Sequence, residues 1–369
     1  MNIQKLAAVA TALFCAAAAR GAEYLVYAGT HTDGSSRGIY GYRFDPKGGK
    51  LKPLGLMATI SNPTFLVEHP DHRFLYAVSE DAGNSISAFL LDPKSGKLAL
   101  VNKVPSRGEG PRHLALDRSG RWLAVAHFES GSITVLPLRE DGGLGAAQAV
   151  VHAEPDRGRP PHAQGLLFSP DNRFLLVADF GLDRIFVYKF DAERGSLKPA
   201  DSPFVPVTPG AGVRHLVFHP NGRMLYALNE IRASVTAYRY EPANGALSEI
   251  QTVSTTPAAN AGAGGAVEIG INAAGTVVYA SNRGLNSMAL LVVDPIRFTL
   301  SPLEFTPLVG STPQHFTLDP TGAYMLVANQ DSNNITVYTV HPHTGQLRPA
   351  GRPAGNIDKP ACVVIVPAQ

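Results

Sequence analysis

The chain has 369 residues, of which 44% are hydrophobic and 17% are charged, and its formal net charge at pH 7 is +2. This composition is typical of a globular protein and excludes an intrinsically disordered one. Because the net charge is small and no run of Lys or Arg is present, we expect no nucleic-acid partner and no membrane-surface partner.

Residues 1–22 have the pattern of a secretory signal peptide. An apolar run at residues 6–19 follows a positive charge, precedes small residues and is too short to span a bilayer. We therefore expect export to the periplasm, cleavage after Ala19 or Ala22, and a mature domain at residues 23–369. A mis-assigned start codon before an apolar leader is the alternative.

Internal repeats dominate the rest of the chain. Six segments combine a short apolar strand, a turn rich in Pro, Asp, Asn and Gly, and a second apolar strand, and they begin about 50 residues apart. They open at Asn62-Pro63-Thr64, Gly110-Pro111-Arg112, Pro161-His162-Ala163, Gly212-Val213-Arg214, Gly265-Ala266-Val267 and Thr312-Pro313-Gln314, and a partial seventh opens at Lys359-Pro360-Ala361. Each repeat continues with two further strands and no helix-length segment, which is typical of a propeller blade.

The two ends of the chain complement each other. The partial seventh repeat supplies one strand, whereas residues 23–28, 38–44 and 51–58 supply three strands that lack a first. Joining them completes a blade and removes exposed sheet edges. The predicted fold is all-β: a seven-bladed β-propeller with four antiparallel strands per blade, closed by the N- and C-terminal strands in one blade.

The fourth repeat contains the clearest hairpin signal, an Asn-Gly step at residues 221–222. If this turn centres on residue 222, residues whose numbers sum to 444 face each other, which would place Arg214 beside Glu230. By the same reasoning, Glu268 should lie nearly opposite Arg283.

Polar side chains recur where the first strand of a repeat begins and the second strand ends. If the first strands line the channel, these positions surround one mouth of it. They are Thr64, Glu80, Arg112, His113, His127, His162, Asp179, Arg214, His215, Asn229, Glu230, Glu268, Asn282, Arg283, Gln314, His315, Gln330 and Lys359. Arginine forks suit carboxylates and phosphates, so this ring predicts a small anionic ligand. The alternative is that the residues form only structural ion pairs and polar caps.

His162 is the candidate proton shuttle, because an unperturbed imidazole titrates near neutral pH. Its alternative is a structural, hydrogen-bonded residue at a strand end. A carboxylate beside a guanidinium is a weaker base than a free one, so we expect Glu230 to orient Arg214 or His162, with direct base catalysis second. The sequence has no Cys/His zinc spacing and no phosphate-binding glycine loop, and we expect neither a metal nor a cofactor.

Several short motifs occur together along the mature chain. They are Gly29-Thr30-His31-Thr32, Arg37-Gly38-Ile39-Tyr40, Pro161-His162-Ala163, Arg214-His215, Leu228-Asn229-Glu230, Val267-Glu268-Ile269, Ser281-Asn282-Arg283-Gly284 and Val327-Ala328-Asn329-Gln330. With these motifs the chain resembles the seven-bladed lactonase family, which includes propeller-type 6-phosphogluconolactonases and carboxy-cis,cis-muconate lactonizing enzymes. Its differences from the family pattern are Gln164 where a His is usual, Gln314-His315 where an Arg is common, and His127-Phe128 where an Asn-Tyr type pair is found.

The resemblance implies a lactone hydrolase similar to 6-phosphogluconolactonase, which opens a sugar lactone by metal-independent attack of water. The residues that it implies as catalytic are His162, Arg214, Glu230 and Arg283, and we add Arg112, His113, Glu268 and His315 as substrate-binding residues. His162, or Glu230 through water, would activate the attacking water. Arg214 and Arg283 would hold the anionic group of the substrate and the oxyanion. Because we expect export, a sugar or aldonic lactone without phosphate stays open as the substrate.

Two other functions remain open. One is the reverse chemistry, a muconate-type lactonizing cyclase, and the other is a non-catalytic periplasmic propeller that binds proteins or cell-wall ligands. A binding propeller more often carries exposed aromatic and apolar side chains, whereas the ring predicted here is charged and rich in histidine. We expect a monomeric enzyme whose partner is a small anionic or sugar lactone.

Overall fold

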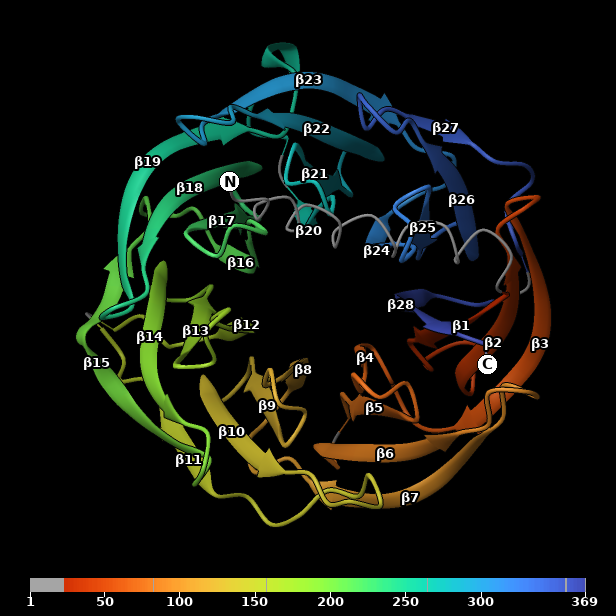
Figure 1. The fold of residues 1–369 in the computed structure, drawn as a ribbon, viewed down its shortest axis with the longest axis horizontal. Coiled ribbons are helices and arrows are strands. Elements are labelled where there is room, and N and C mark those ends of the chain that lie inside the picture. The colour runs from red at the N-terminus through yellow and green to blue at the C-terminus, as the bar shows by residue number, and fades with distance from the viewer. Residues whose placement is uncertain (1–22, 82, 157, 264, 356, 369) are drawn as a thin grey trace, which may run out of the picture.

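The computed structural model describes residues 23–369 apart from 82, 157, 264, 356 and 369, so the predicted signal peptide lies outside the described residues. The described residues form seven four-stranded antiparallel sheets, or blades, arranged as a ring around a central axis (Figure 1). One short 3-10 turn, η1 (Ala258–Asn260), is the only helical element within this part of the chain. The predicted all-β, seven-bladed propeller is confirmed.

The strands of each blade follow one another from the axis outward. Blade 1 contains β4 (Leu66–Glu68), β5 (Phe74–Ser79), β6 (Ser85–Leu91) and β7 (Leu98–Pro105); blade 2 contains β8 (Pro111–Leu116), β9 (Trp122–His127), β10 (Ser132–Pro137) and β11 (Ala149–His152); blade 3 contains β12 (Ala163–Phe168), β13 (Phe174–Asp179), β14 (Arg184–Asp191) and β15 (Ser196–Pro206). Blade 4 contains β16 (Val213–Phe218), β17 (Met224–Asn229), β18 (Ser234–Glu241) and β19 (Ala246–Ser254); blade 5 contains β20 (Ala266–Ile271), β21 (Val277–Asn282), β22 (Ser287–Val293) and β23 (Leu300–Pro307). Blade 6 contains β24 (Pro313–Leu318), β25 (Tyr324–Asn329), β26 (Asn334–Val340) and β27 (Leu347–Pro349); blade 7 contains β28 (Pro360–Pro367), β1 (Tyr24–Thr30), β2 (Gly38–Asp45) and β3 (Lys50–Thr59).

Blade 7 closes the ring with strands from both ends of the described chain. The C-terminal strand β28 takes the axial position and pairs antiparallel with β1, with Tyr24 opposite Pro367 and Ala28 opposite Val363. This pairing leaves no open edge between the first and last blades, as the sequence predicted.

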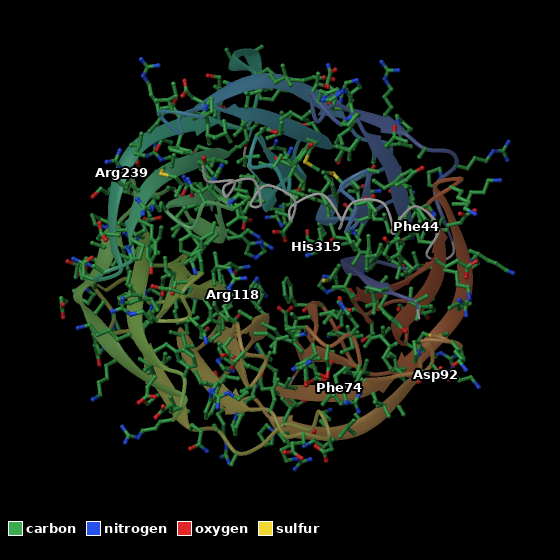
Figure 2. The ribbon with its side chains drawn as sticks, viewed as in Figure 1. Phe44, Phe74, Asp92, Arg118, Arg239 and His315 are labelled. Atoms are coloured by element: carbon green, nitrogen blue, oxygen red, sulfur yellow. The ribbon has the colours of Figure 1, made fainter. Side chains whose placement is uncertain are left out.

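The second strand of each blade is buried because both of its faces pack against neighbouring blades. Every residue of β5, β9, β13, β17 and β21 is buried. One hydrophobic cluster joins Leu176 of blade 3 to Leu225 and Tyr238 of blade 4, and the other interfaces have similar clusters. Polar side chains such as Asp92 and Arg239 lie toward the outside of the ring, whereas His315 points toward its centre (Figure 2).

A repeated hydrogen bond fastens neighbouring blades together. A tyrosine in the second strand of one blade donates to the turn between the third and fourth strands of the next. The pairs are Tyr27 with the carbonyl of Gly96 (2.9 Å), Tyr76 with Gly142 (3.0 Å) and Tyr279 with Gly345 (2.9 Å). These glycines have φ values of 74°, 77° and 72°, which glycine adopts without strain. In blade 2 the indole of Trp122 makes the corresponding bond, to the carbonyl of Ala192 at 2.8 Å.

The register of the fourth hairpin differs by one residue from the prediction. His219 bonds to Met224 across the turn, and Leu216 pairs with Ala227, so paired numbers sum to 443. The prediction of 444 is wrong because four residues lie between His219 and Met224, so the turn centres between residues 221 and 222. A β-bulge at Arg214 interrupts the register at the axial end of the hairpin.

The tyrosine bonds between blades give a first prediction. Replacing Tyr76 with Phe leaves the buried carbonyl of Gly142 without its donor, and we expect the free energy of unfolding to fall by about 1–2 kcal/mol. Denaturation in urea measures this change. The matched control is Tyr42→Phe, because Tyr42 is also a buried residue but its hydroxyl makes no hydrogen bond to a described residue. An equal loss of stability in both variants would contradict the prediction.

Candidate active site at the propeller axis

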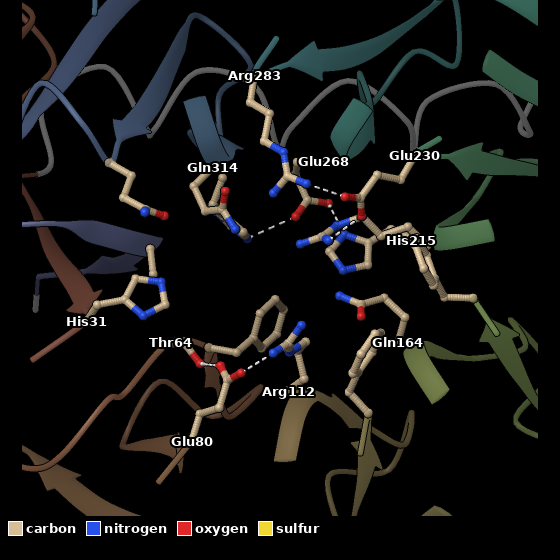
Figure 3. Close-up of a pocket in the computed structure, with 17 residues that line it drawn as sticks. His31, Thr64, Glu80, Arg112, Gln164, His215, Glu230, Glu268, Arg283 and Gln314 are labelled. Atoms are coloured by element: carbon tan, nitrogen blue, oxygen red, sulfur yellow. Dashed lines mark hydrogen bonds and ion pairs between the residues drawn. The ribbon is translucent and has the colours of Figure 1, made fainter. Parts of the chain in front are cut away.

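The seven axial strands surround a hollow of about 290 Å³, called here the axial pocket (Figure 3). Fourteen of its lining residues form two rings with one residue from each blade. The strand ring, near the start of each axial strand, consists of Thr64, Arg112, Gln164, Arg214, Glu268, Gln314 and Ala361; the loop ring, directly after each second strand, consists of His31, Glu80, Phe128, Phe180, Glu230, Arg283 and Gln330. Phe65, His215 and His315 complete the lining.

One backbone hydrogen bond repeats in all seven blades and holds the two rings together. In blade 4 the N–H of Glu230 donates to the carbonyl of Gly212, which lies two residues before Arg214, at 2.9 Å. The equivalent bonds in the other blades have lengths of 2.8 to 3.0 Å. The repeat of the sequence therefore brings two side chains from every blade to the axis.

Glu230 joins two arginines of the pocket. Its Oε2 lies 2.7 Å from Nη1 of Arg214, and its Oε1 binds Nη2 of Arg283 in the next blade. Arg214 also donates from Nε to the carbonyl of Val267 at 2.8 Å. Arg214 and Glu230 are each only 9% exposed, so these bonds fix both side chains in a largely desolvated wall.

Glu268 does not face Arg283 as the sequence predicted. Ala266 pairs with Asn282 and Ile269 with Ala280, so β20 carries an additional residue across a bulge. The bulge directs Glu268 into the pocket, where its Oε1 lies 3.1 Å from Nδ1 of His215 and accepts the N–H of Ile269 at 3.0 Å. Its Oε2 lies 3.5 Å from Nε2 of His315.

Three histidines and Phe65 pack together beside this carboxylate. The centroid of the Phe65 ring lies 4.2 Å from that of His113, 5.7 Å from that of His315 and 6.4 Å from that of His215. Burial lowers the pKa of all three histidines, so they are uncharged at neutral pH. His113 lies behind the lining and does not belong to it.

Unpartnered polar atoms also reach the pocket. Arg112 binds Glu80 and lies over the ring of Phe128, 4.5 Å from its centroid, but its Nε is buried without a hydrogen-bond partner. The Nε2 of Gln164 and the Oε1 of Gln314 are likewise buried without a partner among the described residues. Leaving each such atom unpaired costs about 1–3 kcal/mol.

His162 lies outside the axial pocket. Its ring stacks on Phe128 at a centroid distance of 4.5 Å, and its Nδ1 lies 2.7 Å from the Phe128 carbonyl. It lines a separate hollow, which shares only Phe180 with the axial pocket. The register explains this position, because Ala163 pairs with Asp179 as Val213 pairs with Asn229. The prediction for the third repeat is therefore one residue too early, because Gln164, and not Ala163, occupies the position that Arg214 has in the fourth repeat.

Of the eight predicted site residues, the structure brings six to the axial pocket: Arg112, Arg214, Glu230, Glu268, Arg283 and His315. Sequence reasoning did not propose His31 as a site residue, although it lines the pocket, and burial lowers its pKa. Aligning β1 with the second strands of the other blades would have identified His31. Its backbone N–H donates to the carbonyl of Lys359, just as the N–H of Glu230 donates to the carbonyl of Gly212.

Two further searches concern the described residues alone. No group of three or more His, Cys, Asp or Glu side chains there has an arrangement that could hold a metal ion. Within the same residues, no helix has the length and hydropathy needed to cross a membrane.

Comparison with known proteins identifies close relatives. The profile of the family described as "Lactonase, 7-bladed beta-propeller" matches residues 25–365. A protein named 6-phosphogluconolactonase from Bacillus subtilis is 30% identical over 330 residues, covering 88% of this chain and 93% of the relative. Another of that name, from Formosa agariphila, is 32% identical over 341 residues and covers 88% and 94%. The structure of a periplasmic gluconolactonase from Pseudomonas aeruginosa is 33% identical with a TM-score of 0.88, covering 94% of this chain and 100% of that one.

The buried histidines predict a pH dependence of stability. Because burial lowers the pKa of His113 in the folded state, the unfolded state binds more protons below about pH 6.5. Its contribution to stability is therefore present above that pH and is lost as the pH falls, by up to about 1.4 kcal/mol per pH unit. We expect the free energy of unfolding of His113→Gln to fall less than that of the native protein between pH 7.5 and 5.5. Urea denaturation at both values measures this, and parallel losses would contradict it.

Proposed function

The chain belongs to the family of seven-bladed β-propeller lactonases, and we propose that it hydrolyses the ring ester of a sugar lactone in the axial pocket. The observation that carries this proposal is the fixed pair of guanidiniums, Arg214 and Arg283, held on Glu230 in a pocket that the amide side chains of Gln164 and Gln314 also line. Such an arrangement suits a polar ligand whose carbonyl oxygen becomes negative during the reaction.

The charge balance of the pocket favours an uncharged substrate. Three arginines and three glutamates line it, and each arginine is already paired with a carboxylate. No arginine is therefore left without a counter-charge for a phosphate dianion, which binds best to unpaired guanidiniums. The amide side chains of Gln164 and Gln314 also line the pocket, and amides suit the hydroxyl groups of a sugar.

We therefore infer an unphosphorylated aldonolactone, of the glucono-δ-lactone type, as the preferred substrate. The relative from Pseudomonas aeruginosa that is named a periplasmic gluconolactonase supports this assignment. The relatives named 6-phosphogluconolactonase make the phosphorylated lactone the second candidate. A muconate-type diacid carries two negative charges, and the balanced pocket offers them no unpaired arginine.

The proposed chemistry is the attack of water on the lactone carbonyl. Arg214 and Arg283 donate hydrogen bonds to the carbonyl oxygen as its negative charge develops, and Glu230 keeps both guanidiniums in place. The scheme uses no metal, because the two guanidiniums supply the positive charge that stabilises the oxyanion. His162 has no direct role in it, since His162 lies outside the axial pocket.

We also propose that residues 1–22 direct the protein to the periplasm, where an unphosphorylated lactone is the natural substrate. The apolar run of the leader and the periplasmic relative support this location. Cell fractionation of a bacterial host should recover the full-length chain in the periplasm and the chain that lacks residues 1–22 in the cytoplasm. Recovery of both forms in the cytoplasm would contradict the proposal.

Assays of the purified protein with two lactones test the function. We expect residues 23–369 to hydrolyse D-glucono-δ-lactone well above its spontaneous rate, and with a higher kcat/KM than 6-phospho-D-glucono-δ-lactone. Preference for the phosphorylated lactone would contradict the substrate assignment, and a lack of activity on any sugar lactone would contradict the proposed function.

Substitutions separate the pocket from its surroundings. Arg214→Ala removes one oxyanion donor, and we expect kcat to fall on the order of 10²- to 10³-fold. His162→Gln should keep kcat within about threefold of the native value, as should Arg239→Ala on the outer face of β18. A large loss of kcat in His162→Gln with an unchanged melting temperature would show that His162 takes part in catalysis.

A further inference from the structure

The three carboxylates of the axial pocket differ in their bonding partners. Both oxygens of Glu230 bind guanidiniums, and the oxygens of Glu80 bind Arg112 and the hydroxyl of Thr64. Glu268 is the one of the three that has no arginine partner. Its contacts are two imidazoles and one backbone N–H.

This difference decides which carboxylate can accept a proton. A guanidinium stays charged throughout the pH range of folded proteins, and a carboxylate bonded to it is held in its charged form. An uncharged imidazole donates a hydrogen bond without supplying a positive charge. The Oε2 of Glu268 has a single contact, at 3.5 Å from His315, so it is the most available carboxylate oxygen of the pocket.

The tautomers of the two histidines follow from their surroundings. Burial lowers the pKa of both His215 and His315, so each imidazole carries one proton. The Nδ1 of His315 lies 3.4 Å from the backbone N–H of Val363 and accepts it, which leaves the proton on Nε2, facing Glu268. The Nδ1 of His215 likewise faces Glu268 and carries the proton there. The N–H of His215 therefore donates to Glu268, and the N–H of His315 lies on the side of the same carboxylate, at 3.5 Å.

Glu268 also lies close to the oxyanion donors. Arg214 bonds to the carbonyl of Val267, the residue directly before Glu268. In the close-up, Glu268, Arg283 and Glu230 project into the pocket from the same side, whereas His31, the other lining base without an arginine partner, lies away from them (Figure 3). A water on Glu268 would therefore approach a carbonyl group that is held by the two arginines.

We propose that Glu268 is the general base of the lactone hydrolysis and that His215 and His315 are positioning residues that hold its carboxylate. This inference rests on the proposed function. The carboxylate takes a proton from water while the water oxygen bonds to the carbonyl carbon. The bond between that carbon and the ring oxygen then breaks, and Glu268 returns the proton to the ring oxygen. The product is a hydroxy acid, whose carboxyl proton passes to solvent.

The groups that face Glu268 determine how its charge responds to pH. They are His113, His215, His315, Arg214, Arg283, Glu230 and Cys362, from the axial strands and from the loop ring. The arginines stay charged, and the three histidines stay uncharged near neutral pH because burial lowers their pKa.

The test is Glu268→Gln, which keeps the size of the side chain and one hydrogen-bond acceptor. We expect kcat on D-glucono-δ-lactone to fall about 10²- to 10⁴-fold, the usual contribution of a general base, while KM changes little. The native kcat should fall on the acid side of its pH profile, and the residual rate of the variant should not show this fall. Glu249→Gln, an exposed position on β19, is the matched control and should behave as the native protein.

Two further variants separate chemistry from folding. Glu268→Ala should recover activity when formate is added, because formate can occupy the vacated space and accept the proton. His215→Asn retains an N–H near the position of Nδ1 and should keep more of kcat than His215→Ala, which has no donor. Melting temperatures identify any variant that fails to fold, and formate rescue does not occur in such a variant.

The outcomes are distinguishable. If the native protein hydrolyses no sugar lactone, both the proposed function and the assignment of Glu268 are wrong. If the native protein is active and Glu268→Gln retains kcat within about threefold, or retains the fall in rate at acid pH, only the assignment of Glu268 is overturned. The same holds if His31→Gln, and not Glu268→Gln, abolishes that fall.

Discussion

The axial pocket depends on one backbone hydrogen bond that every blade repeats. The residue after the second strand donates to a carbonyl that lies near the start of the first strand, and this bond holds the loop ring beside the strand ring. The bond involves only the backbone, so it places no demand on the side chains of the two rings. A propeller can therefore keep its fold while the chemistry of these positions changes, and the function has to be argued from the residues that occupy them.

In this chain the carboxylates of the two rings have different partners. One carboxylate oxygen of Glu230 binds Arg214 and the other binds Arg283, and these bonds hold both guanidiniums in place. Glu268 lies one blade further on, within a bulge, and its partners are two imidazoles instead of guanidiniums. Two carboxylates of the same chemistry acquire different roles because their environments differ, as is common for acid and base pairs in enzymes.

The sequence predicted the architecture better than the site. Strand periodicity and turn residues repeat seven times, so the number of blades and the closure of the ring followed directly. The errors are shifts of one residue. Ala163 pairs with Asp179 as Pro111 pairs with His127, whereas the prediction placed His162 at this position, and a shift of one residue in a strand sends a side chain to the other face. Bulges such as that before Glu268 leave no mark in the pattern of apolar residues.

The use of histidine beside Glu268 links the proposed base to the proposed substrate. A buried carboxylate needs hydrogen-bond donors, and a Lys or Arg would supply them together with a positive charge that cancels its own. Uncharged imidazoles supply donors alone, so the carboxylate keeps its negative charge and its ability to take a proton. The same negative charge would repel a substrate that carries a phosphate, whereas a neutral lactone can approach it. The negative charge that the proposed base needs would therefore also disfavour an anionic substrate.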